Sequence, residues 1–569
     1  MFAQYMVWKR RNKKKYSAEL HPDEILIDVN NLPAFDRQQF EGRMEQPLRK
    51  QSFGILLGVM IVIALFFVGR LGFLQIAKSS YYERKSENNS LNHIAVFADR
   101  GVIYDRNGVE LAWNTPGNDV VPTFRNYIQQ GGFASLLGYV SYPAKDTRGK
   151  FWQTRTMGKD GVEKQFDTDL AGQNGTQLTE TDVNGNMVSQ GLIEDPVQGK
   201  NISLAIDTRV ESTLYDGIKA LAEQSGYVGG AGAVMNITTG ELIAMTSYPE
   251  YDENILSTGK DTTTINSYLK DPARPFLNRL TDGLYTPGSI VKPFFAIGAL
   301  QEGVIDPDTV LHTTGEVRIP NPYAPGQFTI FKDNANHGDV DMRKAIAVSS
   351  DAYFYEIGGG LGSQPGLGIV NIDKYADLFG IGQKTGINFS GELTGTIPSI
   401  AWKAKNFPKD PTWRVGDTYH TAIGQYGFQV TPIQMLRAVA GIASHGTLVT
   451  PSILKSLDGK PLGPVEHLPF TEAQYQVIDE AMRMTVTDPK GTATALQNPN
   501  LAVAAKSGTA QISGNTRVNS WIEGYFPLEK PKYAFIVLME NGPIVSSGAK
   551  YAMKPVIDLY ASNPDLLTQ

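Results

Sequence analysis

A chain of 569 residues is long enough for two or more domains with large buried cores. Hydrophobic residues make up 41% of it and charged residues 19%, which excludes a disordered chain or a collagen-like repeat. The net charge of −6 is mild, and the absence of cysteine fits an exported domain that uses no disulfides.

The N-terminal segment combines clustered positive charge with a long apolar run. Six lysines and arginines fall within residues 9–15, and residues 53–69 carry no charge. The apolar character continues to residue 77, and about 20 such residues are enough for a helix to cross a membrane. A cleaved signal peptide is not favoured, because the run starts far into the chain and is too long. We therefore predict one transmembrane helix over residues 53–77.

The positive charges also predict the orientation of this helix. Lysine and arginine collect on the cytoplasmic side of a membrane, so residues 1–52 are expected to be a cytoplasmic tail. Everything after about residue 78 would then lie outside the cytoplasmic (inner) membrane. A basic arm for nucleic acid is an alternative interpretation of residues 9–15, but the adjacent span decides against a nucleic-acid partner.

Residues 80–198 contain short strand-like runs separated by turn signals. Asn184-Gly185 stands between two such runs, a pattern typical of a β-hairpin. No cluster of catalytic residue types occurs in this part, so we expect a spacer or docking domain. The segment Asp195–Asn201 predicts its boundary.

The sequence pattern of residues 200–569 differs from that of residues 80–198. Residues 203–224 begin as a strand and become an amphipathic helix, and residues 232–249 contain two strand patterns around a turn. Near the end, residues 532–542 predict a buried strand and residues 549–561 a helix. Strands at both ends with helices between them predict an α+β domain whose sheet is closed by distant segments.

Ser289-x-x-Lys292 lies at the predicted start of a buried helix, after the turn Thr286-Pro287-Gly288. Positions i and i+3 share a helix face, which would bring the lysine beside the serine hydroxyl. A helix N-cap is the plainer interpretation of this serine. The same spacing begins at four other serines, in less suitable surroundings: Ser257, Ser267, Ser452 and Ser547.

Two further strings favour a nucleophile at Ser289. Ser349-x-Asp351 lies in a loop that leads into a helix, and Lys506-Ser507-Gly508-Thr509 ends an apolar strand. Ser-x-x-Lys, Ser-x-Asn (here Ser-x-Asp) and Lys-Thr-Gly (here Lys-Ser-Gly-Thr) are typical, in this order, of penicillin-binding proteins and class A β-lactamases.

With these motifs the chain resembles the class B (monofunctional) penicillin-binding proteins, the D,D-transpeptidases of peptidoglycan synthesis. The similarity covers about residues 53–560 and includes the strings DRGVIYDRNGVELAWN, GKDGVEKQFDTDLAG, GDTYHTAIGQYGFQVTP and NSWIEGYFPLEKPKYAFIVLMENG. It implies a pedestal (dimerisation-type) domain at residues 80–198 and a transpeptidase domain, an antiparallel sheet flanked by helices, at residues 200–569. The string SSDAYFY is more similar to the elongation-type (cell-shape) branch than to the division-type (septal) branch.

The resemblance implies a serine acyl-enzyme. Ser289 Oγ would attack the penultimate D-alanyl carbonyl of a stem peptide, D-Ala would leave, and an amine from a neighbouring stem would complete the cross-link. Lys292 is the implied base, which must be neutral to act, and Ser349 the implied proton relay. β-Lactams are implied as inhibitors that acylate the same serine.

The Lys-Ser-Gly-Thr segment is implied to bind the terminal carboxylate of the substrate, through Lys506, Ser507, Gly508 and Thr509. Backbone N–H groups at the nucleophile and at Thr509 would form the oxyanion hole. A second lysine and burial would both lower the pKa of the base.

Asp351 leaves a question open. A carboxylate near Lys292 would stabilise the ammonium form and oppose its use as a base. Either Asp351 is paired elsewhere, or it belongs to a lysine network whose protons are shared.

Other classes of protein carry the same motifs. A β-lactamase or D,D-carboxypeptidase would use the same motifs, but a β-lactamase needs neither a membrane anchor nor a pedestal. A non-catalytic β-lactam sensor or scaffold is a further alternative. Asp333-x-x-x-His337 has helical spacing but lies in a loop-like string, so we expect no metal site there, and no cofactor.

Partners follow from the resemblance as well. The chain should cross-link glycan strands without making them, because residues 78–200 are too short for a glycosyltransferase domain. We therefore expect a multi-pass membrane glycan polymerase of the shape-elongation-division-sporulation family beside it. Gly54, Gly58 and Gly69 in the span, or the pedestal, would provide the contact.

Overall fold

The chain divides into two compact units, residues 1–90 and residues 91–569. The computed structural model describes residues 50–82, 92–118, 121, 123–147, 151–181, 187–321, 324–512, 514, 516–544 and 548–568.

In the first unit, one helix carries the apolar run. α1 (Lys50–Gly72) continues into a π-helical turn, η4 (Phe73–Ala77). Residues 53–77 are long and apolar enough to cross a membrane, and none of their apolar window is buried against protein. The predicted cytoplasmic tail lies outside the described residues, apart from residues 50–52.

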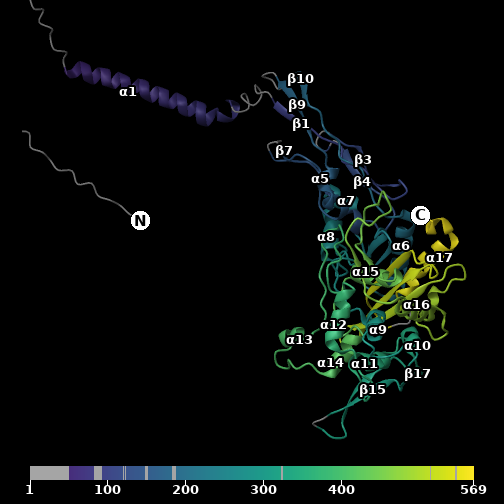
Figure 1. The fold of residues 1–569 in the computed structure, drawn as a ribbon. Coiled ribbons are helices and arrows are strands. Elements are labelled where there is room, and N and C mark those ends of the chain that lie inside the picture. Colours follow the sequence, from purple (N-terminus) through teal and green to yellow (C-terminus); the bar gives the residue numbers. More distant parts are fainter. Residues whose placement is uncertain are drawn as a thin grey trace, which may run out of the picture. The chain divides into compact units, whose positions relative to one another are not determined.

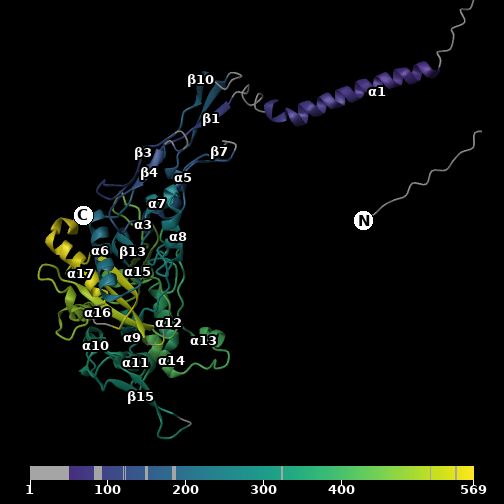
Figure 2. The same cartoon turned by 180° about the vertical axis from the view of Figure 1, so that it is seen from behind.

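The second unit begins with the strand-rich pedestal, which lies at one end of the unit in both views (Figures 1 and 2). One sheet has the strand order β1-β9-β10, with β1 (Asn92–Val96), β9 (Gly175–Thr181) and β10 (Met187–Glu194). A second has the order β11-β2-β3-β4, with β2 (Ile103–Tyr104), β3 (Glu110–Pro116), β4 (Thr123–Tyr127) and β11 (Ile202–Ser203). The smaller elements are β5 (Val140–Ser141), β6 (Ala144–Lys145), β7 (Phe151–Gln153), β8 (Met157–Gly158), α3 (Ala134–Leu137), α4 (Gly161–Gln165) and α5 (Asp167–Leu170).

The predicted hairpin and boundary can both be located in these sheets. β9 and β10 pair antiparallel, as the hairpin pattern requires, while Asn184-Gly185 itself lies outside the described residues. β11 pairs in parallel with β2, so residues 202–203, just beyond the predicted boundary, still belong to a pedestal sheet.

The centre of the second unit is an antiparallel sheet with the strand order β13-β12-β22-β21-β20, which fits the predicted α+β class. Its strands are β12 (Gly229–Asn236), β13 (Leu242–Tyr248), β20 (Ala504–Ile512), β21 (Arg517–Phe526) and β22 (Tyr533–Gly542). Two predicted strand patterns at one end of the domain therefore pair with a third pattern near the C-terminus. β20 is an edge strand of this sheet.

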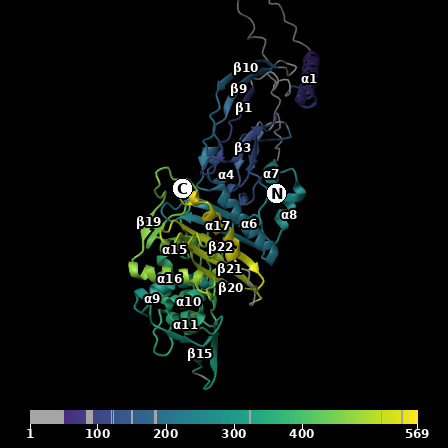
Figure 3. The same cartoon turned by 90° about the vertical axis from the view of Figure 1, so that its right-hand side faces the viewer.

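Helices cover both faces of this sheet (Figure 3). Side chains alternate along β22, so Phe535 and Val537 join a core under α6 (Thr208–Ser225) and α17 (Lys550–Ser562). Ile536 and Leu538 face the other way, into a core with α9 (Lys292–Gln301), α15 (Pro432–Ala443) and α16 (Glu472–Thr487). Because both faces of the sheet are buried, the sequences of these strands are continuous apolar runs.

The remaining elements surround the second core. The helices are α7 (Glu253–Thr258), α8 (Thr262–Lys270), α10 (Met342–Val348), α11 (Asp351–Gly359), α12 (Gly368–Leu378), α13 (Ile400–Asn406) and α14 (Val415–Ala422). The short strands are β14 (Leu311–Thr313), β15 (Glu316–Pro320), β16 (Phe328–Lys332), β17 (Gly338–Val340), β18 (Thr447–Val449) and β19 (Val465–His467). The 3₁₀ turns are η5 (Gly288–Val291), η6 (Thr494–Leu496) and η7 (Pro564–Leu567).

Candidate active site

Ser289 lies in a helical turn that packs against the edge strand of the central sheet. The predicted helix does not begin as an α-helix: Ser289 belongs to the 3₁₀ turn η5, and α9 begins at Lys292. Side chains three apart are eclipsed in a 3₁₀ turn, so the pair still shares a face. Gly508 of β20 allows the close approach, because a Cβ there would lie 2.9 Å from Ile290 Cγ2 and 3.1 Å from the Pro287 carbonyl oxygen.

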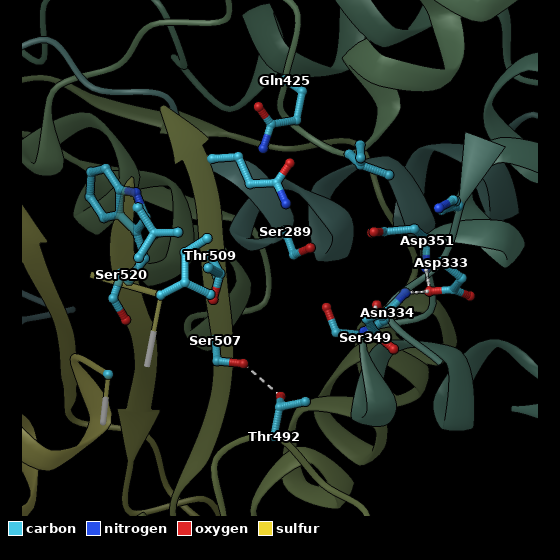
Figure 4. Close-up of a pocket in the computed structure, with 18 of the residues that line it drawn as sticks. Ser289, Asp333, Asn334, Ser349, Asp351, Gln425, Thr492, Ser507, Thr509 and Ser520 are labelled. Carbon is cyan, nitrogen blue, oxygen red and sulfur yellow. Dashed lines mark hydrogen bonds between the residues drawn. The ribbon is translucent and has the colours of Figure 1, made fainter. Parts of the chain in front are cut away.

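A cleft of about 1100 Å³ opens beside this turn. Ser289 is half-buried at its wall, and within the described part of the chain its hydroxyl makes no hydrogen bond. Figure 4 shows Ser289, Ser349, Ser507 and Thr509 around the same opening, with Gln425 above Ser289 in this view. The structure therefore brings all three predicted strings to one cleft.

Ser349 is held in a strained backbone conformation between two helices. It follows α10 with a φ of 59°, in the left-handed region that non-glycine residues rarely adopt, and Ser350 then caps α11. Such strain occurs preferentially where the surrounding structure must aim a functional group. The bend turns the Ser349 hydroxyl toward two buried lysines.

Lys292 is fully buried and makes three contacts through Nζ. It donates to Asp351 Oδ1 at 2.6 Å, to the Ser349 carbonyl oxygen at 2.9 Å and to Ser349 Oγ at 3.4 Å. The contact with Asp351 is a short charge-assisted hydrogen bond. Of the two alternatives for Asp351, pairing elsewhere is therefore wrong in this structure, since its carboxylate contacts the lysine itself.

Lys506 reaches the same serine from β20. Its Nζ donates to Ser349 Oγ at 2.8 Å and to the Ser507 carbonyl oxygen at 2.7 Å, and the side chain is fully buried. Burial, followed by the positive charge of Lys292, holds the pKa of Lys506 well below its usual value. The two lysines thus meet at one hydroxyl, and the neutral form is favoured at Lys506.

The carboxylate-binding segment lies within β20, near its start, and not at the end of an apolar strand as predicted. Ser507 and Thr509 line the cleft, and Ser507 Oγ donates to Thr492 Oγ1 at 2.6 Å (Figure 4). Thr509 is exposed, whereas Gly508 is buried against η5. The two hydroxyl side chains of the segment are therefore available to a ligand in the cleft.

Two residues that position the site, Asp333 and Asn334, were not identified from the sequence. Asp333 accepts hydrogen bonds from the Asp351 amide at 2.7 Å, the Ala352 amide at 3.0 Å and Ser350 Oγ at 2.6 Å. Asn334 donates from Nδ2 to the Ser349 carbonyl oxygen at 3.0 Å. The string KDNANHGD gave no signal for this role, because a cap supplied from outside its own helix leaves no local pattern.

Asp333 is fully engaged as a cap, which argues against a metal at this place. Among the described residues, no group of three or more metal-binding side chains occurs. His337 Nε2 lies 2.7 Å from Asn334 Oδ1 and 3.8 Å from Asp333 Oδ1. Asp333 and His337 therefore lie near each other in the loop, and His337 contacts Asn334 more closely.

Replacing Asp333 with alanine should remove three hydrogen bonds at the start of α11. We expect a loss of about 1–2 kcal/mol of stability, the size typical of a lost helix cap. Acylation should fall about tenfold as Asp351 and Ser349 lose their positions. Thermal unfolding and β-lactam acylation rates check both parts.

Asp252→Ala is the matched control, because Asp252 caps α7 through two backbone amides away from the cleft. It should lose similar stability with unchanged acylation. Equal acylation rates for both variants would contradict the positioning role of Asp333.

The other Ser-x-x-Lys serines lie in different settings. Ser257 is buried and accepts a hydrogen bond from the Val140 amide at 3.2 Å. Ser452 is buried in a β-bridge with Glu241 and accepts a hydrogen bond from the Leu454 amide at 3.1 Å. Ser267 donates to a carbonyl oxygen within α8, and Ser547 lies outside the described residues. Of the described serines in these strings, Ser289 alone lines the cleft.

Tyr426 belongs to the string Gly-Gln-Tyr-Gly at residues 424–427, next to Gln425. Tyr426 has a φ of 63°, and its ring stacks on Phe407 at 6.0 Å and contacts Trp402 edge-on at 5.6 Å. Gln425 still lines the cleft. Tyr426 thus belongs to an aromatic cluster that borders the cleft.

Comparison with known families agrees with this geometry. The family model described as "Penicillin binding protein transpeptidase domain" matches residues 230–558, and one described as "Penicillin-binding Protein dimerisation domain" matches residues 118–204. The first match covers more than half of the chain, so the chain belongs to the penicillin-binding protein transpeptidase family. The predicted family and fold are confirmed.

Within that family, the chain is most readily compared with peptidoglycan D,D-transpeptidases. The protein named MrdA from Haemophilus influenzae is 31% identical, over 78% of this chain and 70% of the relative. MrdA from Acinetobacter baumannii is 30% identical, over 79% and 68%. FtsI from Escherichia coli is 24% identical, over 86% and 87%.

Solved structures give the same grouping. Penicillin-binding protein 2 of Pseudomonas aeruginosa, in complex with WCK 5153, matches with a TM-score of 0.67 and 30% identity, over 82% of this chain and 96% of that chain. The complex of penicillin-binding protein 2 and MreC from Helicobacter pylori matches with a TM-score of 0.68 and 26% identity, over 84% and 100%. The chain is a penicillin-binding D,D-transpeptidase of peptidoglycan synthesis.

Proposed function

We propose that Ser289 is the nucleophile of this transpeptidase and forms an acyl-enzyme with the stem peptide. The observation that carries the proposal is the cleft in which Ser289 faces a hydroxyl shared by two buried lysines. A serine hydroxyl is a weak nucleophile and needs an adjacent base, which the lysines can supply. β-Lactams would acylate the same oxygen.

The proton must move before Lys292 can act as the base. Lys292 donates to Asp351 and Ser349, while the neutral form is favoured at Lys506. A proton can pass from Lys292 through the Ser349 hydroxyl to Lys506. The transfer leaves Lys292 neutral to accept the proton of Ser289 and makes Lys506 a cation.

An anionic substrate would favour that transfer. The terminal carboxylate of the stem peptide would lie against Ser507 and Thr509, where it stabilises an ammonium at Lys506. The backbone N–H groups of Ser289 and Thr509 would hold the developing oxyanion, and one such donor is typically worth roughly 3 kcal/mol. Substrate binding and base formation are thereby coupled.

Asp351→Asn tests the assignment of the lysine protons. The substitution removes the negative charge beside Lys292 Nζ, so the acid limb of the pH profile of the acylation rate should move to lower pH. At neutral pH the rate should fall only about tenfold, because the base remains in place. The measurement is the pH dependence of β-lactam acylation.

Asp488→Asn provides the control, because it removes the aspartate of a lysine pair with Lys344 that does not line the cleft. Its acid limb should match that of the unmodified protein. An Asp351→Asn variant as inactive as Lys292→Ala would require a direct role for Asp351 in the reaction.

The competing functions differ in what happens after acylation. A transpeptidase holds the β-lactam adduct, whereas a β-lactamase hydrolyses it quickly, and a scaffold or sensor role would be favoured if Ser289 never acylates. The higher identity to MrdA than to FtsI supports the elongation-type over the division-type branch. Mass measurement of the adduct over time separates the enzyme classes.

The membrane orientation and the domain limits complete the proposal. We place residues 1–52 in the cytoplasm, the span at 53–77 in the cytoplasmic membrane, the pedestal at 80–198 and the transpeptidase domain at 200–569 outside. The single candidate span among the described residues and the two family matches support this division. The pedestal is also a candidate surface for a protein of the MreC kind, by similarity to the Helicobacter complex.

A glycan polymerase of the shape-elongation-division-sporulation family is the proposed membrane partner. In vesicles with lipid-linked disaccharide precursor, the protein alone should give no glycan polymer. Adding the polymerase should give polymer that becomes cross-linked only when Ser289 is intact. Polymer made by this chain alone would overturn the assignment.

A further inference from the structure

Glu523 is a buried acid directly behind the active-site lysine. It lies in the middle of β21 and pairs across the strands with Lys506 of β20, so the two side chains project from the same face of the sheet. Both residues are fully buried. Trp521 and Tyr525, two positions away on either side, belong to the core under the catalytic helix, which places Glu523 in that core.

The carboxyl group of Glu523 has no compensating partner. Within the described part of the chain, neither of its oxygens makes a hydrogen bond or an ion pair. Burial raises the pKa of Glu523 well above its usual value, and Lys506 opposes that shift. An unpaired buried carboxyl is costly even when neutral, so structure alone gives no reason for a glutamate here.

The other charged groups on the surrounding elements have partners of their own. Lys292 on α9 contacts Asp351, and Arg437 on α15 pairs with Glu466. On α16, Asp479 contacts Tyr525 and His445, and Arg483 donates to a carbonyl oxygen. Lys506 is the one charged group of the described residues that acts on Glu523.

We propose that Glu523 is a positioning residue that raises the proton affinity of Lys506 by ionising opposite its ammonium. In the free enzyme both groups are neutral. When an anionic ligand occupies the cleft, Lys506 takes the proton of Lys292 through the Ser349 hydroxyl, and Glu523 releases its own proton to solvent, which leaves a carboxylate opposite an ammonium. The inference rests on the proposed function, in which Lys506 must become a cation to hold the substrate carboxylate. Glu523 thereby sets the upper pH limit of the reaction.

The test compares two acylating agents over a range of pH. With a penicillin that has a free carboxylate, Glu523→Gln should move the alkaline limb of the acylation rate to lower pH by about one unit. Glu523→Met should cause the same shift, and Glu523→Asp should restore part of it. With the methyl ester of the same penicillin, the alkaline limbs of the variants and the unmodified protein should coincide.

Glu211→Gln is the matched control. Glu211 is a second fully buried acid, on α6, and burial raises its pKa to about 8. Its replacement should change thermal stability without moving the alkaline limb. If the alkaline limb of the acylation rate stays in place in Glu523→Gln or Glu523→Met while Ser289 is still acylated, the role of Glu523 is overturned and the proposed function is not. Failure of the unmodified protein to acylate at Ser289 would instead overturn the proposed function.

A second measurement needs no variant and so does not depend on their folding. The infrared spectrum of the unmodified protein should lose the band of one buried protonated carboxyl group on acylation by the free-carboxylate penicillin. The ester should leave that band in place. An unchanged band with both agents contradicts ionisation of Glu523.

Discussion

Ser289→Ala is expected to abolish acylation by β-lactams, with a rate at least on the order of 10⁶-fold below that of the unmodified protein, the size seen when a serine nucleophile is removed. Ser349 Oγ is held by Lys506, and Ser507 Oγ by Thr492, so neither hydroxyl replaces the lost nucleophile. The fold should persist, because Ser289 makes no side-chain hydrogen bond to the described residues. Labelling with a fluorescent penicillin and thermal unfolding measure both outcomes.

Ser267→Ala is the matched control, since Ser267 begins another Ser-x-x-Lys string, on α8. It should label like the unmodified protein. Mass mapping of the adduct to any serine other than Ser289 would refute the assignment.

Lys292→Ala should lower the acylation rate by about 10⁴-fold, the upper end of what a positioned general base contributes. We expect no other group to accept the proton from Ser289 as readily, because Lys506 is already engaged with the Ser349 hydroxyl and the Ser507 carbonyl oxygen. The substitution also leaves Asp351 without its lysine, so Lys292→Met, which keeps the volume, accompanies it.

Lys270→Ala is the matched control, because Lys270 is the lysine of the Ser-x-x-Lys string that begins at Ser267 on α8. It should acylate normally. A Lys292→Met variant that unfolds at the same temperature as the unmodified protein and still acylates within tenfold would show that another group is the base.

Local patterns predicted those elements whose stabilising partners are close in sequence or belong to a long apolar run. The span over residues 53–77 and the strands on either side of residues 182–186 are of this kind. The strand at residues 532–542 was also predicted, because burial on both faces makes it apolar throughout. The three site strings were found because each has a short, fixed spacing.

The parts that escaped prediction depend on contacts between distant segments. The 3₁₀ turn at Ser289 is imposed by packing on β20, and the cap of α11 comes from Asp333 in a preceding loop. The pairing of Lys506 with Glu523 follows from the register of β20 and β21, which no spacing reveals. The direct contact of Lys292 with Asp351 required the relative position of two helices.

Among the described residues β20 ends the strand order of the central sheet, which has a consequence for solubility. An edge strand with unpaired backbone groups can recruit another extended chain, which proteins normally prevent by covering or charging the edge. Here β20 must stay open to the cleft, and its exposed side chains there are the polar Thr509 and Gln511. Apolar substitutions at these two positions would therefore favour self-association through edge pairing, so resistance to aggregation and substrate binding constrain the same short stretch of chain.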